Sequence, residues 1–245
     1  MKAGFTMKAL SLAVLGLAGL GYGASAMAVC PTDPAQPAGP WTSKSTLGGS
    51  LAISTPGFNS TECKLDAQLT ANLGGGTASV RDNTPSAEPR YRMRFFVNAD
   101  ALTGQNSIQG VKIFSANTDT PYLSIAEAFK ITMFGNVAGT QRSISLIMGC
   151  DGQPSNLCSA NFPLTAGVNS IQVDWTKGTS ATVKVWVNST NEATPTGTLT
   201  GNTNGWSVDY AVLGLANAAP GYRANQLNKI VSLDEFDSRR TTFIN

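Results

Sequence analysis

The sequence contains no histidine, and this limits the chemistry that its side chains can perform. Ser-His-Asp triads, Cys-His pairs and the usual metal-hydrolase centres are excluded, because each needs an imidazole as base or ligand. Acid–base chemistry would therefore fall to carboxylates, chiefly the pair Glu235 and Asp237 near the end of the chain. Phenols are the remaining option, carried by Tyr91, Tyr122, Tyr210 and Tyr222.

A second group of residues has the composition of a sugar-binding surface. Strand alternation places Trp186 on one face with Lys184, and Gln172 and Asp174 occupy the polar face of the neighbouring strand. An indole ring can stack on the C–H face of a sugar while amide and carboxylate groups bind its hydroxyls. Trp206 and Tyr210 share a face of their own predicted strand and could extend the platform. The alternative is that these tryptophans belong to the core, where Trp is commonly buried.

Two loops carry aspartates that calcium could use, since this ion takes several oxygen ligands from carboxylates and carbonyls. Asp119 lies in NTDT, and Asp151 lies in CDGQPSN. Neither loop has the aspartate spacing of an EF-hand. Solvated turns are the alternative interpretation, so calcium is only a candidate cofactor.

Four cysteines in an exported chain favour disulfides. Cys150 and Cys158 bracket a polar turn that could bring them together, which leaves Cys30 to pair with Cys63. In the chain-entropy model the two loops, of about 8 and 33 residues, contribute about 2.5 and 3.7 kcal/mol. A zinc site is the rival interpretation, but the chain has no CxxC motif to support it.

The elements that position these residues are predicted to be strands, and residues 169–188 give the clearest signal. Ile171, Val173 and Trp175 alternate with polar residues, and Val183, Val185 and Val187 do the same after a short turn. This period of two predicts a half-buried antiparallel hairpin. Further alternating stretches predict strands at about 47–54, 62–72, 90–98, 110–116, 128–136, 142–150, 206–214 and 229–239.

The predicted strand at 90–98 separates two kinds of side chain. Tyr91, Met93, Phe95 and Val97 fall on one side, and Arg90, Arg92 and Arg94 fall on the other. The acids of the last strand, Asp234, Glu235 and Asp237, are the expected partners of these arginines if the two strands pair. We therefore predict a cross-strand cluster of exposed ion pairs, each contributing under about 1 kcal/mol. An anion-binding stripe is the alternative.

Residues 1–28 have the layout of a secretory signal, with two lysines, an apolar run and small residues before Val29. We predict a secreted protein, periplasmic or extracellular, without a membrane span. Residues 29–45 are proline-rich and predicted to form an extended arm, and residues 46–245 one β-sandwich domain. Removing the two signal lysines from 17 basic residues leaves 15 against 15 acidic ones. This neutral balance argues against a nucleic-acid partner.

Three stretches together resemble the laminin G and concanavalin A-like jelly-roll sandwiches: RYRMRFFVNA, NSIQVDWTKGTSATVKVWVN and IVSLDEFDSRR. The resemblance covers about residues 90 to 240 and implies an all-β, two-sheet antiparallel jelly roll. It also implies glycan or protein binding, sometimes through calcium, or polysaccharide cleavage in some branches. Retaining glycosidases of this fold carry Glu, one residue, Asp, two residues, Glu on one strand. Glu235 and Asp237 match the first two places, but Arg240 takes the third.

These patterns predict a secreted, non-catalytic sandwich that binds carbohydrate or another surface polymer. Two alternatives stay open: a polysaccharide-cleaving enzyme that uses Glu235 and Asp237, and an adhesive surface protein whose partner is another protein or a second copy. Fold alone does not choose among them.

Overall fold

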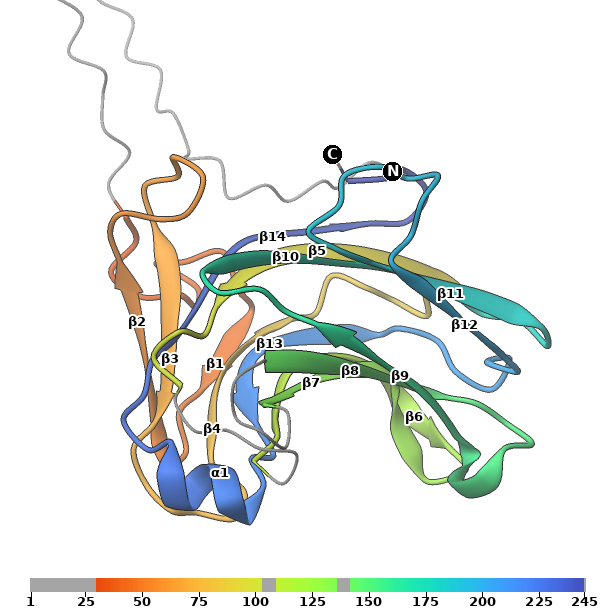
Figure 1. Cartoon of the computed structure of the whole chain (residues 1–245), viewed down its shortest axis with the longest axis horizontal. Coiled ribbons are helices and arrows are strands. Elements are labelled where there is room, and N and C mark those ends of the chain that lie inside the picture. The colour runs from red at the N-terminus through yellow and green to blue at the C-terminus, as the bar shows by residue number, and fades with distance from the viewer. Residues whose placement is uncertain (1–29, 103–108, 136–141, 245) are drawn as a thin grey trace, which may run out of the picture.

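The computed structural model describes residues 30–102, 109–135 and 142–244, and the predicted signal at 1–28 lies outside them. The described chain forms two antiparallel sheets of seven strands each (Figure 1). A single short α-helix, α1 (Pro220–Asn225), lies between the last two strands. Among the described residues no helix is long and apolar enough to cross a membrane.

We name the two sheets by their curvature in Figure 1, where one arches over the other. The concave sheet turns the hollow side of the curve outward and has the order β1 (Ser43–Ser45), β4 (Thr77–Asp82), β13 (Tyr210–Ala216), β6 (Val111–Tyr122), β7 (Ile125–Gly135), β8 (Arg142–Gly149), β9 (Leu157–Pro163). The convex sheet covers its other side and has the order β12 (Gly197–Gly201), β11 (Ala181–Val187), β10 (Val168–Thr176), β5 (Arg90–Asn98), β14 (Val231–Arg239), β3 (Lys64–Leu69), β2 (Gly49–Ser54).

The core lies between the sheets and is built by the predicted alternation. On β5 the apolar set Tyr91, Met93, Phe95 and Val97 is fully buried, as predicted. Aromatic rings then bridge the two sheets: Phe95 lies 5.9 Å from Phe114, Phe114 lies 5.7 Å from Phe129, and Phe129 lies 6.5 Å from Trp175, all between ring centroids. Offset pairs of this kind stabilise a core beyond the area they bury.

The predicted hairpin at 169–188 is confirmed as β10 and β11, which pair antiparallel with Gln172 opposite Trp186 and Asp174 opposite Lys184. The all-β two-sheet prediction is also confirmed. Four short strands were not predicted, namely β1, β4, β9 and β12. Three of them are sheet edges, where polar, Gly and Pro residues are tolerated and the alternation is correspondingly weak.

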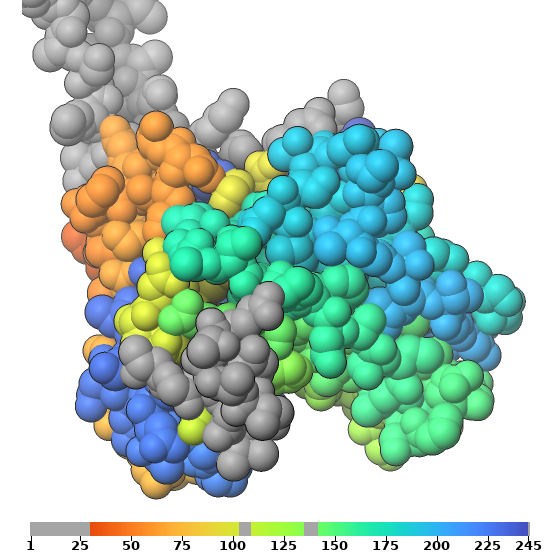
Figure 2. Space-filling view, viewed as in Figure 1, coloured from red at the N-terminus to blue at the C-terminus, as the bar shows by residue number. Residues whose placement is uncertain are grey.

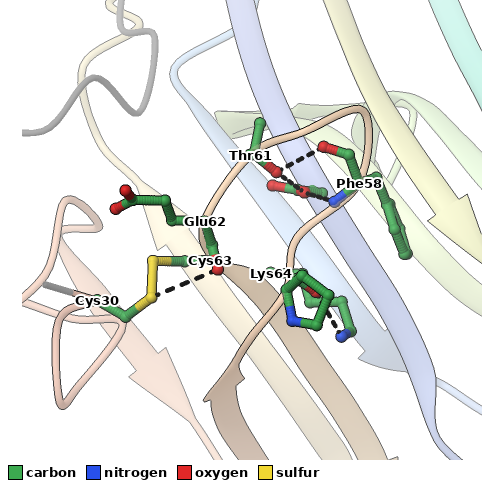
Figure 3. Close-up of a disulfide and its surroundings, with 8 residues drawn as sticks. Cys30, Phe58, Thr61, Glu62, Cys63 and Lys64 are labelled. Atoms are coloured by element: carbon green, nitrogen blue, oxygen red, sulfur yellow. Dashed lines mark hydrogen bonds between the residues drawn. A yellow bond between two sulfur atoms is a disulfide. The ribbon is translucent and has the colours of Figure 1, made fainter. Parts of the chain in front are cut away.

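Both predicted disulfides are confirmed: Cys30 is bonded to Cys63, and Cys150 is bonded to Cys158. Figure 3 shows the first bond beside the loop that precedes β3. This bond ties the start of the described chain to the convex sheet. Trp41 adds a second attachment, because its ring packs 5.0 Å from that of Phe236, and Ser43–Ser45 of the predicted arm forms edge strand β1.

Candidate functional site

The predicted sugar-binding surface around Trp186 lies on the outer face of the convex sheet, and it is covered. Trp186 has no exposed surface. Its indole Nε1 donates a hydrogen bond to the Asn191 carbonyl at 2.9 Å, and its ring meets Phe243 edge to face at 5.1 Å. The prediction that these residues share a face is confirmed, but the expectation of an open aromatic platform is wrong. Alternation identifies a face and says nothing of what packs on it.

Two segments make this cover. The loop between β11 and β12 rises above the convex sheet (Figures 1 and 2), and its Glu192 binds Arg92 at 2.9 Å. The segment after β14 lays Phe243 and Ile244 on the same surface. With its amide oriented to satisfy both groups, Gln172 donates to the Ile244 carbonyl at 3.0 Å and accepts from the Ile244 N–H at 3.3 Å.

Two of the three arginines of β5, Arg90 and Arg92, pair with Asp174 of β10. Asp174 accepts hydrogen bonds from Arg90 at 2.9 and 2.7 Å and forms an ion pair with Arg92 at 2.8 Å. Burial raises the pKa of Asp174, but the two arginines lower it more, so the pKa lies below its ordinary value. The predicted ion pairing with the acids of the last strand is therefore wrong for Arg90 and Arg92. Arg94 does lie opposite Asp237 on the paired strand β14, where Glu235 and Asp237 interact with it electrostatically.

The acids of the last strand are committed to structural roles. A bulge at Glu235, which has a φ of 49°, interrupts the alternation between Asp234 and Asp237. Asp234 accepts hydrogen bonds from the N–H of Phe58 and the hydroxyl of Thr61, both at 2.6 Å, and Asp237 binds Arg239 at 2.8 Å. Glu235 and Asp237 therefore do not form the regular same-face pair that a carboxylate mechanism would use.

Trp206 and Tyr210 do not share a strand face as predicted. β13 begins at Tyr210, so Trp206 lies in the loop before it. Trp206 is fully buried, donates to the Ile125 carbonyl at 3.1 Å and packs edge to face on Tyr122. Tyr210 is half-buried on the concave sheet, with the Arg81 guanidinium 3.6 Å from its ring centroid. They do not extend the Trp186 surface, because Tyr210 belongs to the other sheet.

Of the two predicted calcium ligands, Asp119 forms a hydrogen bond through its backbone, and Asp151 forms hydrogen bonds through its carboxylate. The backbone N–H of Asp119 donates to Asp209 at 2.8 Å, and Asp151 accepts from the Tyr122 hydroxyl and from Asn202. Throughout the part of the chain that the structure describes, no three His, Cys, Asp or Glu side chains come together in a way that could hold a metal ion.

The outer face of the concave sheet carries side chains in register across five strands. One row runs Val212, Ser115, Lys130, Ile147, Ser159, from β13 to β9. A neighbouring row places Tyr210 opposite Asn117, and Asn117 opposite Glu127. The floor of this face is preorganised, because the Asn117 amide donates to both the hydroxyl and the carbonyl of Ser115 at 3.1 Å.

A pocket of about 280 Å³ lies on this face, near the lower limit of small-ligand sites. One part of its lining is polar, from Asn117, Glu127 and Lys130. The other part is largely apolar, from Ile125, Ala126, Ile147, Met148 and Leu157. A site with these two sides suits a ligand that has an apolar face and a hydroxyl-rich edge.

Glu127 is the charged centre of the pocket. Its carboxylate lies 3.1 Å from the ammonium of Lys112 and 3.4 Å from that of Lys130. Burial raises the pKa of Glu127, but the two lysines outweigh it and hold the pKa below its ordinary value. Glu127 therefore stays ionised near neutral pH and orients both ammonium groups, which leaves the cluster with one net positive charge.

Asn117, Glu127 and Lys130 were not predicted as site residues. Alternation within the predicted strands 110–116 and 128–136 was the available signal, but bulges break it. Ile113 and Phe114 are adjacent and both buried, and the register shifts again between Ala116 and Asn117. A strict period of two therefore assigns the wrong face to part of β6.

No protein-family model matches the sequence, and no curated protein sequence matches it. Solved structures do share its architecture. The alginate lyase from Klebsiella pneumoniae aligns with a TM-score of 0.52 at 10% identity over 81% of this chain and 86% of that chain. The marine PL7 alginate lyase from Zobellia galactanivorans gives 0.51 at 11% identity over 73% and 78%.

A carbohydrate esterase from the Shiga toxin-encoding bacteriophage phi24B gives a TM-score of 0.50 at 12% identity, over 81% of this chain and 90% of that chain. The chain is a jelly-roll sandwich. At such identities the likeness shows the fold alone. It agrees with the concanavalin A-like jelly roll expected from the sequence and does not single out the laminin G branch of that resemblance.

Proposed function

We propose that this jelly roll binds carbohydrate on the outer face of its concave sheet. The observation that carries the proposal is the divided lining of the pocket, in which Ile147 and Leu157 face the same space as Asn117, Glu127 and Lys130. A sugar ring fits such a site, because its C–H face packs on aliphatic groups while its hydroxyls accept from ammonium and amide groups and donate to a carboxylate.

The rest of the face gives the proposed ligand room to continue. Tyr210 lies in the row beside the pocket, on the Asn117 side, and its ring and the Arg81 guanidinium form an aromatic–cationic pair. Lys130 and Ser159 add hydrogen-bonding groups across the sheet. This arrangement supports an oligosaccharide or surface polymer rather than a single sugar. The alginate lyases and the carbohydrate esterase that share the fold act on ligands of the same chemical class.

Binding is favoured over two-carboxylate hydrolysis by the lining of the pocket, which contains one carboxylate. Two-carboxylate hydrolysis needs one acid that can donate a proton. Glu127 is the one carboxylate that lines the described pocket, and its lowered pKa keeps it ionised. Polysaccharide cleavage remains the second candidate, and the experiment below distinguishes the two.

We place this function outside the cytoplasm. Two disulfides close in the structure, and such bonds persist in oxidising compartments. The predicted signal at residues 1–28 supports the same location.

The test is calorimetric titration of the purified protein with a panel of neutral and acidic oligosaccharides. Lys130→Ala should weaken the best ligand about tenfold or more, because a hydrogen bond from a charged donor is lost. Lys177→Ala removes an exposed lysine from the turn between β10 and β11 and should leave affinity unchanged. Equal affinity for Lys130→Ala, Asn117→Ala and wild type would remove the proposed site.

Cleavage is tested on the same panel by measuring new reducing ends. We expect none after prolonged incubation. Product that forms with wild type and disappears with Glu127→Gln would replace the binding proposal with the enzyme.

A further inference from the structure

The segment Arg240–Ile244 has an unusual path. It leaves β14 and crosses back over the outer face of the convex sheet, where its last two residues lie on side chains of β5, β10 and β11 rather than on their own strand. Phe243 is 8% exposed and Ile244 is fully buried, whereas Thr241 and Thr242 between them and β14 are exposed. Figure 1 shows the end of the described chain beside the loop that follows β11.

The surface under Phe243 and Ile244, which we call the 243–244 groove, holds this segment as a receptor holds a peptide. The Phe243 ring meets Trp186 edge to face at 5.1 Å, and the Arg92 guanidinium lies 5.8 Å from the same ring. Gln172 binds both the N–H and the carbonyl of Ile244. Side-chain amides that pair with backbone groups recognise an extended peptide, and the aromatic contact supplies specificity.

Two side chains of the groove are also held by contacts outside the segment that fills it. The Trp186 indole is fixed by its hydrogen bond to Asn191, and Arg92 is fixed by Asp174 and Glu192. Two nitrogens of Arg92, Nε and Nη1, are buried without a hydrogen-bond partner among the described residues. The docked segment therefore leaves these two donors unused.

The segment, in turn, is attached by a short exposed link. Arg240 is held at the base by an ion pair with Glu88 at 2.7 Å, and Thr241 and Thr242 then lead to the docked pair. We infer that the 243–244 groove is a peptide-recognition site for an aromatic–aliphatic pair in an extended backbone, filled here in cis, and that it accepts the same segment from a second copy of the chain.

When two copies exchange this segment, each groove keeps the same contacts. The monomer and the exchanged dimer therefore differ only in whether the segment and the groove belong to the same chain. The cis segment acts at an effective concentration of about millimolar or above, because its link is short. At micromolar concentration the wild type should therefore be monomeric. Exchange between copies becomes favourable where the cis segment is released or where copies are crowded on a surface.

The contacts of Trp186 and Gln172 favour a peptide over a sugar as the ligand of the 243–244 groove. The Trp186 N–H is already used by Asn191, and the Gln172 amide pairs with a peptide N–H and carbonyl together. This site is separate from the concave face, so its test is independent of the proposed carbohydrate function.

The test is complementation between two full-length variants. Phe243→Ala keeps the groove and loses the aromatic anchor, whereas Trp186→Ala keeps the segment and loses the groove. Each alone should run as a monomer in light scattering, and an equimolar mixture should form a one-to-one complex. Gln172→Ala, which removes only the amide, serves as the groove variant if Trp186→Ala does not fold.

A synthetic peptide with the sequence of residues 239–244, Arg-Arg-Thr-Thr-Phe-Ile, gives a second measurement. It should bind Phe243→Ala at least tenfold more tightly than it binds wild type, and Arg-Arg-Thr-Thr-Ala-Ile should not bind. The inference is overturned if the mixture stays monomeric and the peptide does not bind. It is also overturned if Phe243→Ala gains affinity for oligosaccharides but none for the peptide.

Discussion

Gly201 lies directly against the sulfur of Cys150. A Cβ atom on Gly201 would stand 2.1 Å from Cys150 Sγ and 3.1 Å from Cys158 Sγ. Gly201 ends β12 at the edge of the convex sheet, whereas the two cysteines flank the turn between β8 and β9 of the concave sheet. The edges of the two sheets thus meet at a disulfide, and only a residue without a side chain fits between them.

Gly201→Ala should therefore lower the free energy of unfolding by about 1–3 kcal/mol, the range for overpacking a filled site. Gly178→Ala is the matched control, because its nearest neighbour, Ala181 Cβ, lies 3.6 Å from the new methyl. Urea unfolding measures both variants. If both variants lost the same free energy of unfolding, the contact with the disulfide would not be the reason that position 201 requires glycine.

The two disulfides should contribute different amounts to the free energy of unfolding. The loops that they close span 33 and 8 residues, so removal of Cys30–Cys63 should cost about 3.7 kcal/mol and removal of Cys150–Cys158 about 2.5 kcal/mol in the chain-entropy model. Paired Cys→Ser variants, unfolded in urea, give the comparison. A larger loss for the short loop would contradict the order predicted by this model.

Asp174→Asn should destabilise the protein at pH 7 by up to about 3 kcal/mol, because buried Arg92 loses its carboxylate partner. The pKa of Asp174 is lower in the folded than in the unfolded state, so its contribution is present above the unfolded value and is lost as pH falls through the folded one. The difference between variant and wild type should accordingly shrink as the pH falls below the pKa of an unfolded aspartate, about 3.9. Unfolding measured from pH 2 to 7 checks this.

Asp33→Asn is the control for that series. Its carboxylate pairs with Lys44 at the surface, so its loss should be much smaller at every pH. A constant difference between Asp174→Asn and wild type down to pH 2 would argue that ionisation of Asp174 is not what stabilises β5 and β10.

Asp234→Ala should release the loop before β3. The Asp234 carboxylate accepts from the Phe58 N–H and the Thr61 hydroxyl, and both groups lie beside the Cys30–Cys63 bond in Figure 3. Loss of this buried acceptor should cost about 1–3 kcal/mol and speed hydrogen exchange at the Phe58 amide. Thr61→Val removes one of the two donors and should have a smaller effect. Unchanged exchange at Phe58 would contradict this role.

The sequence predicted those parts of the fold that follow from strict alternation. Tyr91, Met93 and Phe95 occupy the core face as their spacing indicated, and Gln172 lies opposite Trp186 as the hairpin required. Both results depend on neighbours in sequence or across one turn. The same local signal failed at Glu235, where a residue with positive φ adds a bulge that side-chain type does not reveal.

The candidate site was predicted less well, because it depends on contacts between distant segments. Trp186 is covered by Phe243, which comes 57 residues later in the chain, and no local pattern indicates that contact. Asn117 lies opposite Glu127 because β7 has an extra residue, Ala128, at this point of its pairing with β6. Residue type could indicate polar groups, but the curvature of the concave sheet and the covered outer face of the convex sheet required the three-dimensional structure.

The strand orders also constrain when this protein can fold. In each sheet a late strand joins strands that come much earlier in the sequence: β13 lies between β4 and β6, and β14 lies between β5 and β3. The core between the two sheets cannot close until β14 is available to pair with β3 and β5. Such pairing between strands far apart in the sequence makes folding slow.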